Sequence, residues 1–107
     1  MDRQTVEVPI WRVSVTVKVR DRNGSPVPGF RVRLRRHGGD DHEEWDLGED
    51  GAVTEAVYAT ACPVYFWLRG TYDGEPVTAL SSHDGIKDDL TLVFQFTERG
   101  RISDVQR

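Results

Sequence analysis

The chain has 107 residues, of which 37% are hydrophobic and 30% charged, and its formal net charge at pH 7 is −4. This length and composition are typical of one globular domain that buries roughly two-thirds of the surface of its unfolded chain. The negative charge disfavours nucleic acid as a partner, and no apolar run approaches the roughly 20 residues of a membrane span, so we expect no membrane insertion. The only cysteine, Cys62, excludes an intrachain disulfide, and we expect it to be a small buried hydrophobic residue.

Alternating apolar and polar residues mark the first two strands. Four valines alternate with polar residues over 13–20, and a second alternation follows over 30–36. The segment 23–26 between them, Asn-Gly-Ser-Pro, has the composition of a turn. Because period-two alternation indicates a strand with one buried face, the chain is expected to begin as a β-sandwich.

Shorter β segments follow along the chain. We expect strands at 43–47, 52–57, 63–68, 76–80 and 90–97, separated by polar or glycine-containing turns. The polar segment 81–89 is predicted to be a loop, and no segment has helical spacing over three turns. These patterns predict a single antiparallel seven-stranded all-β sandwich.

The sandwich is expected to span residues 13–97. Segment 1–12 before it is a candidate extra edge strand, and segment 98–107 after it is predicted to be a flexible tail or a tail that docks on a partner. The predicted core consists of Val13, Val15, Val17, Val19, Phe30, Val32, Leu34, Trp45, Leu47, Val64, Phe66, Leu68, Leu92, Phe94 and Phe96.

Segment 24–34, Gly-Ser-Pro-Val-Pro-Gly-Phe-Arg-Val-Arg-Leu, resembles the D-x-x-G-x-P-V-x-G-A-x-V-x-L pattern of prealbumin-like sandwich domains. Segment 49–53 is similar to their T-D-x-D-G-x-F turn, and segment 70–72 to their P-G-x-Y motif. The family includes carboxypeptidase regulatory-like domains, Cna-type B repeats and transthyretin-like proteins. The resemblance covers about 13–96 and implies a prealbumin-like or immunoglobulin-like fold, but a fold does not fix a function.

Two functions known in that family fit these residues poorly. Cna-type B repeats often link a first-strand lysine to a last-strand asparagine, but Val19 occupies the lysine position here and 90–97 contains no asparagine. Transthyretin-related hydroxyisourate hydrolases carry an N-terminal histidine and a final Tyr-Arg-Gly-Ser. This chain has no histidine before His37 and ends Ser-Asp-Val-Gln-Arg, so the hydrolase remains only a second alternative.

A row of arginines precedes the acidic segment 40–50. It consists of Arg31, Arg33, Arg35 and Arg36. Alternate residues of a strand point the same way at a spacing of about 7 Å, so this row is a candidate charged recognition face for phosphates or an acidic partner.

Local pairing within a hairpin is the alternative for these arginines, and it is favoured because one register satisfies both faces. That register pairs Leu34 with Trp45, Val32 with Leu47, Arg35 with Glu44 and Arg33 with Asp46. Opposite charges across two strands contribute roughly 0.2–1 kcal/mol per pair.

Aromatic residues form the second candidate surface. If Val64, Phe66 and Leu68 face the core, Tyr65 and Trp67 point outward. We expect Arg69 and Tyr58 to join them in a binding site for a protein or a sugar. The alternative is that the N-terminal segment, through Val8, Ile10 and Trp11, covers these rings.

Catalytic and metal-binding patterns find little support. The histidines and carboxylates of segment 37–44 match neither a zinc motif nor a calcium loop. Ser81, Ser82, His83 and Asp84 are neighbours on a predicted loop, where a catalytic triad rarely converges. We therefore expect no catalytic residue, no metal and no cofactor.

The residues together predict a non-catalytic binding or structural module that docks on a larger protein assembly, such as a virion, an injection machine or a partner enzyme. Its expected partner is another protein or a second copy of the chain. A carbohydrate-binding module is the first alternative. Because the start Met-Asp-Arg-Gln-Thr has no apolar segment behind it, we expect no signal peptide. The expected location is the cytoplasm or a particle assembled there.

Overall fold

The structure of the protein is a computed structural model that describes residues 11–37, 42–97 and 102–106. Every regular element in these ranges is a β-strand. The strands are β1 (Arg12–Arg20), β2 (Arg31–Arg36), β3 (His42–Asp46), β4 (Ala52–Tyr58), β5 (Val64–Tyr72), β6 (Glu75–His83), β7 (Leu90–Phe96) and β8 (Ile102–Gln106). The described ranges contain no helix that could span a membrane.

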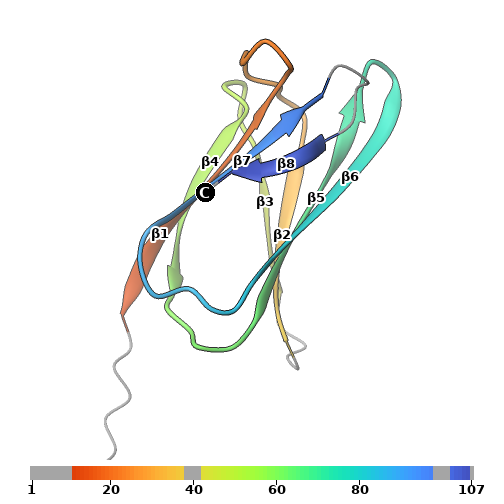
Figure 1. Cartoon of the computed structure of the whole chain (residues 1–107). Coiled ribbons are helices and arrows are strands. Elements are labelled where there is room, and N and C mark those ends of the chain that lie inside the picture. The colour runs from red at the N-terminus through yellow and green to blue at the C-terminus, as the bar shows by residue number, and fades with distance from the viewer. Residues whose placement is uncertain (1–10, 38–41, 98–101, 107) are drawn as a thin grey trace, which may run out of the picture.

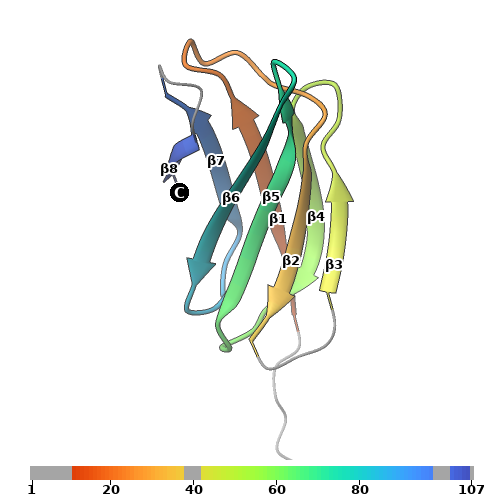
Figure 2. The same cartoon turned by 90° about the vertical axis from the view of Figure 1, so that its right-hand side faces the viewer.

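The strands form two four-stranded sheets, ordered β4-β1-β7-β8 and β3-β2-β5-β6. Figure 1 shows the two layers side by side, and Figure 2 looks onto the β3-β2-β5-β6 sheet with the other sheet behind it. The expectation of a two-sheet all-β fold is thus confirmed.

One pairing departs from the predicted antiparallel arrangement. Strands β1 and β7 are parallel neighbours, with Val17 beside Leu92, whereas all other pairings between the named strands are antiparallel. The chain passes to the opposite sheet and back between β1 and β7, so no tight hairpin forces these two strands to run in opposite directions.

The structure has one strand more than the seven predicted. The additional strand, β8, lies within segment 98–107, which has no apolar alternation, and it pairs with β7. Pairing at a sheet edge uses backbone N–H and C=O groups, which every non-proline residue has, so it can form without a side-chain pattern. Of segment 1–12, only Trp11 and Arg12 are described, and the expected extra edge strand lies outside the described residues.

The core lies between the two sheets, as the alternation predicts. All the residues expected there are buried except Trp45, which is partly buried and packs against the core. Val27, Val57 and Ile86 are also buried. The inner valines of β1 are fully covered because β1 lies inside its sheet, while β3, which carries Trp45, is an edge strand.

Two local predictions are wrong. Strand β6 continues to His83, so Ser81 and Ser82 belong to a strand and not to a loop. Ser81 and His83 face the core and share a hydrogen bond of 2.8 Å between Oγ and Nε2. This bond lets two polar side chains be buried at low cost, which a count of apolar residues does not anticipate. Cys62 is exposed, because it lies in the turn between β4 and β5.

Candidate functional site

The outer face of the β3-β2-β5-β6 sheet brings together the predicted arginine row and the predicted aromatic surface. Cross-strand pairing over β2, β5 and β6 gives three rows: Arg31, Arg69 and Thr78; Arg33, Trp67 and Leu80; Arg35, Tyr65 and Ser82. The residues between them along each strand face the core. We call this surface the arginine–aromatic face and define it by Arg31, Arg33, Arg35, Tyr65, Trp67, Arg69 and Leu80.

Tyr58 is not part of this face, contrary to the prediction. It lies on β4, in the other sheet, where 49% of the residue is exposed. The guanidinium of Arg12 lies 4.8 Å from the centre of the Tyr58 ring, and its Nη2 donates to the Tyr58 hydroxyl at 3.2 Å. This hydrogen bond raises the pKa of Arg12 above its ordinary value.

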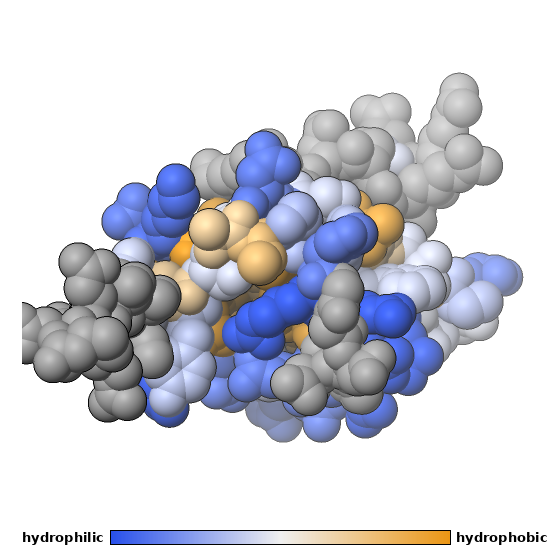
Figure 3. Space-filling model, turned by 90° about the horizontal axis from the view of Figure 1, so that it is seen from below, coloured by the Kyte–Doolittle hydropathy of each residue, from blue (hydrophilic) through white to orange (hydrophobic). Residues whose placement is uncertain are grey.

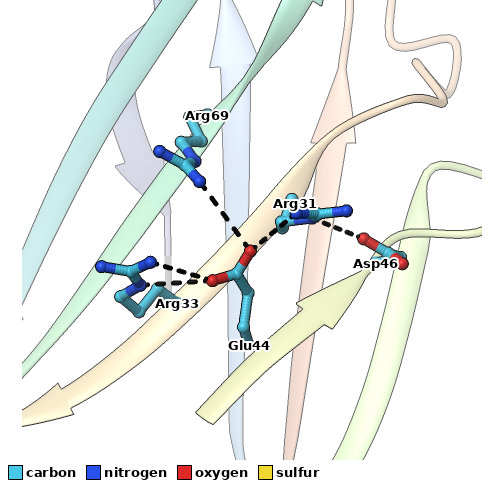
Figure 4. Close-up of polar contacts among 5 residues, drawn as sticks. All are labelled: Arg31, Arg33, Glu44, Asp46 and Arg69. Atoms are coloured by element: carbon cyan, nitrogen blue, oxygen red, sulfur yellow. Dashed lines mark hydrogen bonds and ion pairs between the residues drawn. The ribbon is translucent and has the colours of Figure 1, made fainter. Parts of the chain in front are cut away.

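Glu44 of β3 organises the arginines at the centre of the face (Figure 4). Its Oε1 lies 3.0 Å from Nη1 of Arg31 and 4.0 Å from Nη2 of Arg69, and its Oε2 accepts from Nε and Nη2 of Arg33 at 3.3 and 3.1 Å. Arg31 also donates from Nε to Asp46 at 2.7 Å. The bonds from Arg33 and then Arg31 lower the pKa of Glu44, while Asp46 and then Glu44 raise the pKa of Arg31.

The hairpin register differs from the predicted one by two residues. Arg33 pairs with Glu44 and Arg31 with Asp46, whereas the prediction paired Arg35 with Glu44 and Arg33 with Asp46. A shift of two residues keeps every side chain on its face, so the pattern of faces was right although the partners were wrong. The actual register continues to Leu47, whose N–H donates to the carbonyl of Phe30 at 2.9 Å.

This register leaves two arginines of the predicted row without an ion pair to any described residue. Arg35 lies opposite His42 rather than a carboxylate, and Arg36 ends β2. Both border a hollow of about 260 Å³ on the arginine–aromatic face. The hollow is lined by Arg33, Arg35, Arg36, His37, Tyr65, Trp67 and Leu80.

His37 and Tyr65 both line this hollow and contact each other. The Nδ1 atom of His37 and the Tyr65 hydroxyl lie within hydrogen-bond distance at 3.2 Å, and the His37 N–H donates to the carbonyl of Pro63 at 2.8 Å. These contacts fix the end of β2 against the start of β5. The rest of the histidine- and acid-rich loop, 38–41, lies outside the described residues, and the described ones contain no cluster suited to a metal ion.

The apolar part of the face is exposed. Half of Trp67 (50%) and more than half of Leu80 (58%) are accessible, and the two residues lie opposite each other on β5 and β6. Trp11 does not cover them, because its indole N–H donates to the carbonyl of Lys87 at 3.2 Å. Val8 and Ile10, the other residues expected to cover the rings, lie outside the described residues. Figure 3 shows the molecule from below. On this side the hydrophobic residues, in orange, form small areas between hydrophilic ones, in blue.

Another hollow, of about 540 Å³, lies beside Arg31 and Arg69. Arg31 is already paired with Glu44 and Asp46, and Arg69 lies near the Oε1 of Glu44. This hollow therefore offers an incoming anion less unpaired positive charge than the hollow at Arg35 and Arg36.

Ser81 and His83 bring a hydroxyl and an imidazole together on β6, although segment 81–89 was predicted to be a loop. Both residues are 7% exposed, and the ring of His83 packs edge-on against Phe66 at 5.5 Å between centroids. A third hollow, of about 430 Å³, is lined by His83 but not by Ser81. Because a nucleophile must reach its substrate, we assign this pair to the core and not to a reactive site.

Comparison of the chain with protein families, with characterised proteins and with solved structures found no match.

Proposed function

We propose that this protein is a non-catalytic binding module of prealbumin-like type that docks on a protein partner within a larger assembly. The docking surface is the arginine–aromatic face. The observation that carries the proposal is the exposed pair Trp67 and Leu80, which lies beside Arg33 and Arg69 on the outer face of the sheet. The prealbumin-like type is supported by the resemblance of segment 24–34 to that family.

The composition of the face supports protein binding. Tryptophan, tyrosine and arginine are the residues that most often carry the binding energy of protein interfaces, and they cluster at the centre of the buried patch. Here Trp67 and Leu80 supply the apolar centre, while Arg33 and Tyr65 adjoin them. The ion pairs of Glu44 hold the nearby guanidiniums in place, which reduces the side-chain entropy lost when a partner binds.

A sugar ligand is the alternative, because an exposed indole offers a stacking surface. Sugars need hydrogen-bond acceptors as well as donors beside that surface. The groups that border Trp67 on β2 are guanidiniums, which only donate. The carboxylate of Glu44 already accepts from Arg33 and pairs with Arg31, and the Tyr65 hydroxyl already contacts His37. Protein docking accounts for more of the residues on this face.

The test compares two aromatic residues of almost equal exposure on opposite sheets, Trp67 at 50% and Tyr58 at 49%. Tagged wild-type protein and the variants Trp67→Ala and Tyr58→Ala are used to isolate partners from cells that produce the protein, after urea titration has shown that both variants fold. We expect a partner that is retained by wild type and Tyr58→Ala and lost from Trp67→Ala. Loss from Tyr58→Ala alone would place the docking surface on the other sheet, and glycans retained in place of protein would favour the sugar-binding alternative.

A further inference from the structure

Arg35 of the arginine–aromatic face and Arg36, which follows it at the end of β2, form no ion pair with any described residue, and both border the same hollow. We infer that the hollow at Arg35 and Arg36 receives the carboxylates of an acidic, extended segment of the partner, with an apolar side chain of that segment against Trp67 and Leu80. This inference rests on the proposed function and specifies the chemistry of the partner.

The face already shows how it binds carboxylates. Each of the first two arginines of β2 contacts the acidic residue directly opposite on β3: Arg31 contacts Asp46, and Arg33 contacts Glu44. The third arginine, Arg35, lies opposite His42, and no described carboxylate forms an ion pair with it. Among the described residues, the hairpin thus pairs the first two arginines of this repeat with carboxylates and leaves the third without one.

The size and lining of the hollow suit one apolar side chain of the partner with acidic side chains beside it. A volume of about 260 Å³ lies below the roughly 300–1,000 Å³ of sites for drug-sized ligands. Trp67 and Leu80 provide apolar surface for one bulky side chain, and Arg35 and Arg36 provide planar donors that can each engage a carboxylate with two hydrogen bonds. An acidic segment with one aromatic or branched residue carries both features.

A nucleic acid would be a poorer match. Single-stranded nucleic acid is usually held by a continuous basic groove that follows the phosphates, together with several stacking platforms. Of the arginines that line the hollow, only Arg35 and Arg36 form no ion pair with a described carboxylate. Glu44 and Asp46 interrupt the positive surface beside them, and the whole chain carries a net charge of −4. A protein segment needs only a short array of charges.

The experiment measures fluorescence anisotropy of labelled peptides with the full chain. The probes are a pentapeptide with phenylalanine between two pairs of glutamate, the same peptide with glutamine in place of glutamate, and a twelve-residue oligothymidine. The test variant is Arg35→Gln with Arg36→Gln. The matched control is Arg20→Gln with Arg22→Gln, which removes the same charge from the end of β1 and the turn after it, where neither residue lines the hollow.

We expect the acidic peptide to bind wild type and to bind the test variant about tenfold or more weakly, since hydrogen bonds to charged groups are the strong ones. The control variant should change the affinity by less than about twofold because distant exposed charges are screened. Equal binding of the glutamine peptide, or an unchanged affinity in the test variant, would overturn the inference. Tighter binding of the oligothymidine that is lost in the test variant would overturn it in favour of nucleic acid.

These results are separable from the proposed function. If Trp67→Ala weakens binding of the glutamine peptide as much as binding of the acidic peptide, the arginine–aromatic face binds protein but does not select carboxylates. If no peptide binds, the acidic-segment inference is wrong, and the comparison of Trp67→Ala with Tyr58→Ala still decides where the partner docks.

Discussion

Truncation of Leu68 and Leu80, on the adjacent strands β5 and β6, tests which face of the β3-β2-β5-β6 sheet is exposed to solvent. Leu68 is fully buried, while Leu80 is 58% exposed on the outer face. Leu68→Ala removes buried methyl groups and leaves a cavity, which costs about 3 kcal/mol. Leu80→Ala loses less than half of the roughly 2 kcal/mol that full burial of leucine provides, and it leaves no cavity because the site opens to water. We therefore expect it to cost about 1 kcal/mol or less.

The assay is urea unfolding of wild type and both variants at one temperature and pH. Equal m-values would show that the comparison concerns stability alone. We expect the free energy of unfolding to fall by about 2 kcal/mol more for Leu68→Ala than for Leu80→Ala. Equal costs would refute the reasoning, because they would mean that a second copy or another part of the chain covers Leu80 in solution.

Three further outcomes follow from single features of the structure. The arginines lower the pKa of Glu44. The contribution of Glu44 to stability is therefore complete above its ordinary pKa of 4.5 and is lost as the pH falls through the lowered value. Urea titrations at several acid pH values should show that stability falls less below pH 4.5 for Glu44→Gln than for wild type. Gly51 has a φ of 67°, and a Cβ there would lie 2.8 Å from the N atom of Val27. Gly51→Ala should therefore lower the free energy of unfolding by about 3 kcal/mol, whereas Gly74→Ala, where a Cβ meets open space, should lower it by about 1 kcal/mol. Similar losses for the two variants in urea unfolding would contradict the steric argument. Deleting the chain after Thr97 removes β8 and uncovers the edge of β7, so light scattering should detect aggregation that the full chain does not show.

Local patterns predicted the parts of the fold that depend on one strand at a time. The valines of β1 and the apolar residues of β5 alternate strictly, and the structure buries them as expected. Alternation also indicated that Trp67 points outward, since its neighbours Phe66 and Leu68 face the core. The hairpin partners were displaced by two residues because faces alone do not distinguish registers that differ by an even number.

The arrangement of the candidate site was beyond these patterns. The arginines of β2 and the aromatic residues of β5 are about thirty positions apart, and only the antiparallel pairing of β2 with β5 places Arg33 beside Trp67. Leu80 completes the apolar pair through β6, and no local pattern indicates that it lies beside Trp67. The position of Tyr58 was wrong for the same reason, since sheet membership depends on contacts between distant segments.

Photo-crosslinking from the two outer faces of the sandwich tests the central claim most directly. A benzoylphenylalanine placed at Leu80, on the arginine–aromatic face, is compared with one at Thr54, on the outer face of the other sheet. We predict that irradiation of cells producing the protein links a partner to position 80 and not to position 54, and that this link disappears when Trp67→Ala is added. A partner linked from position 54 alone would show that the protein docks through the opposite sheet and would contradict the account.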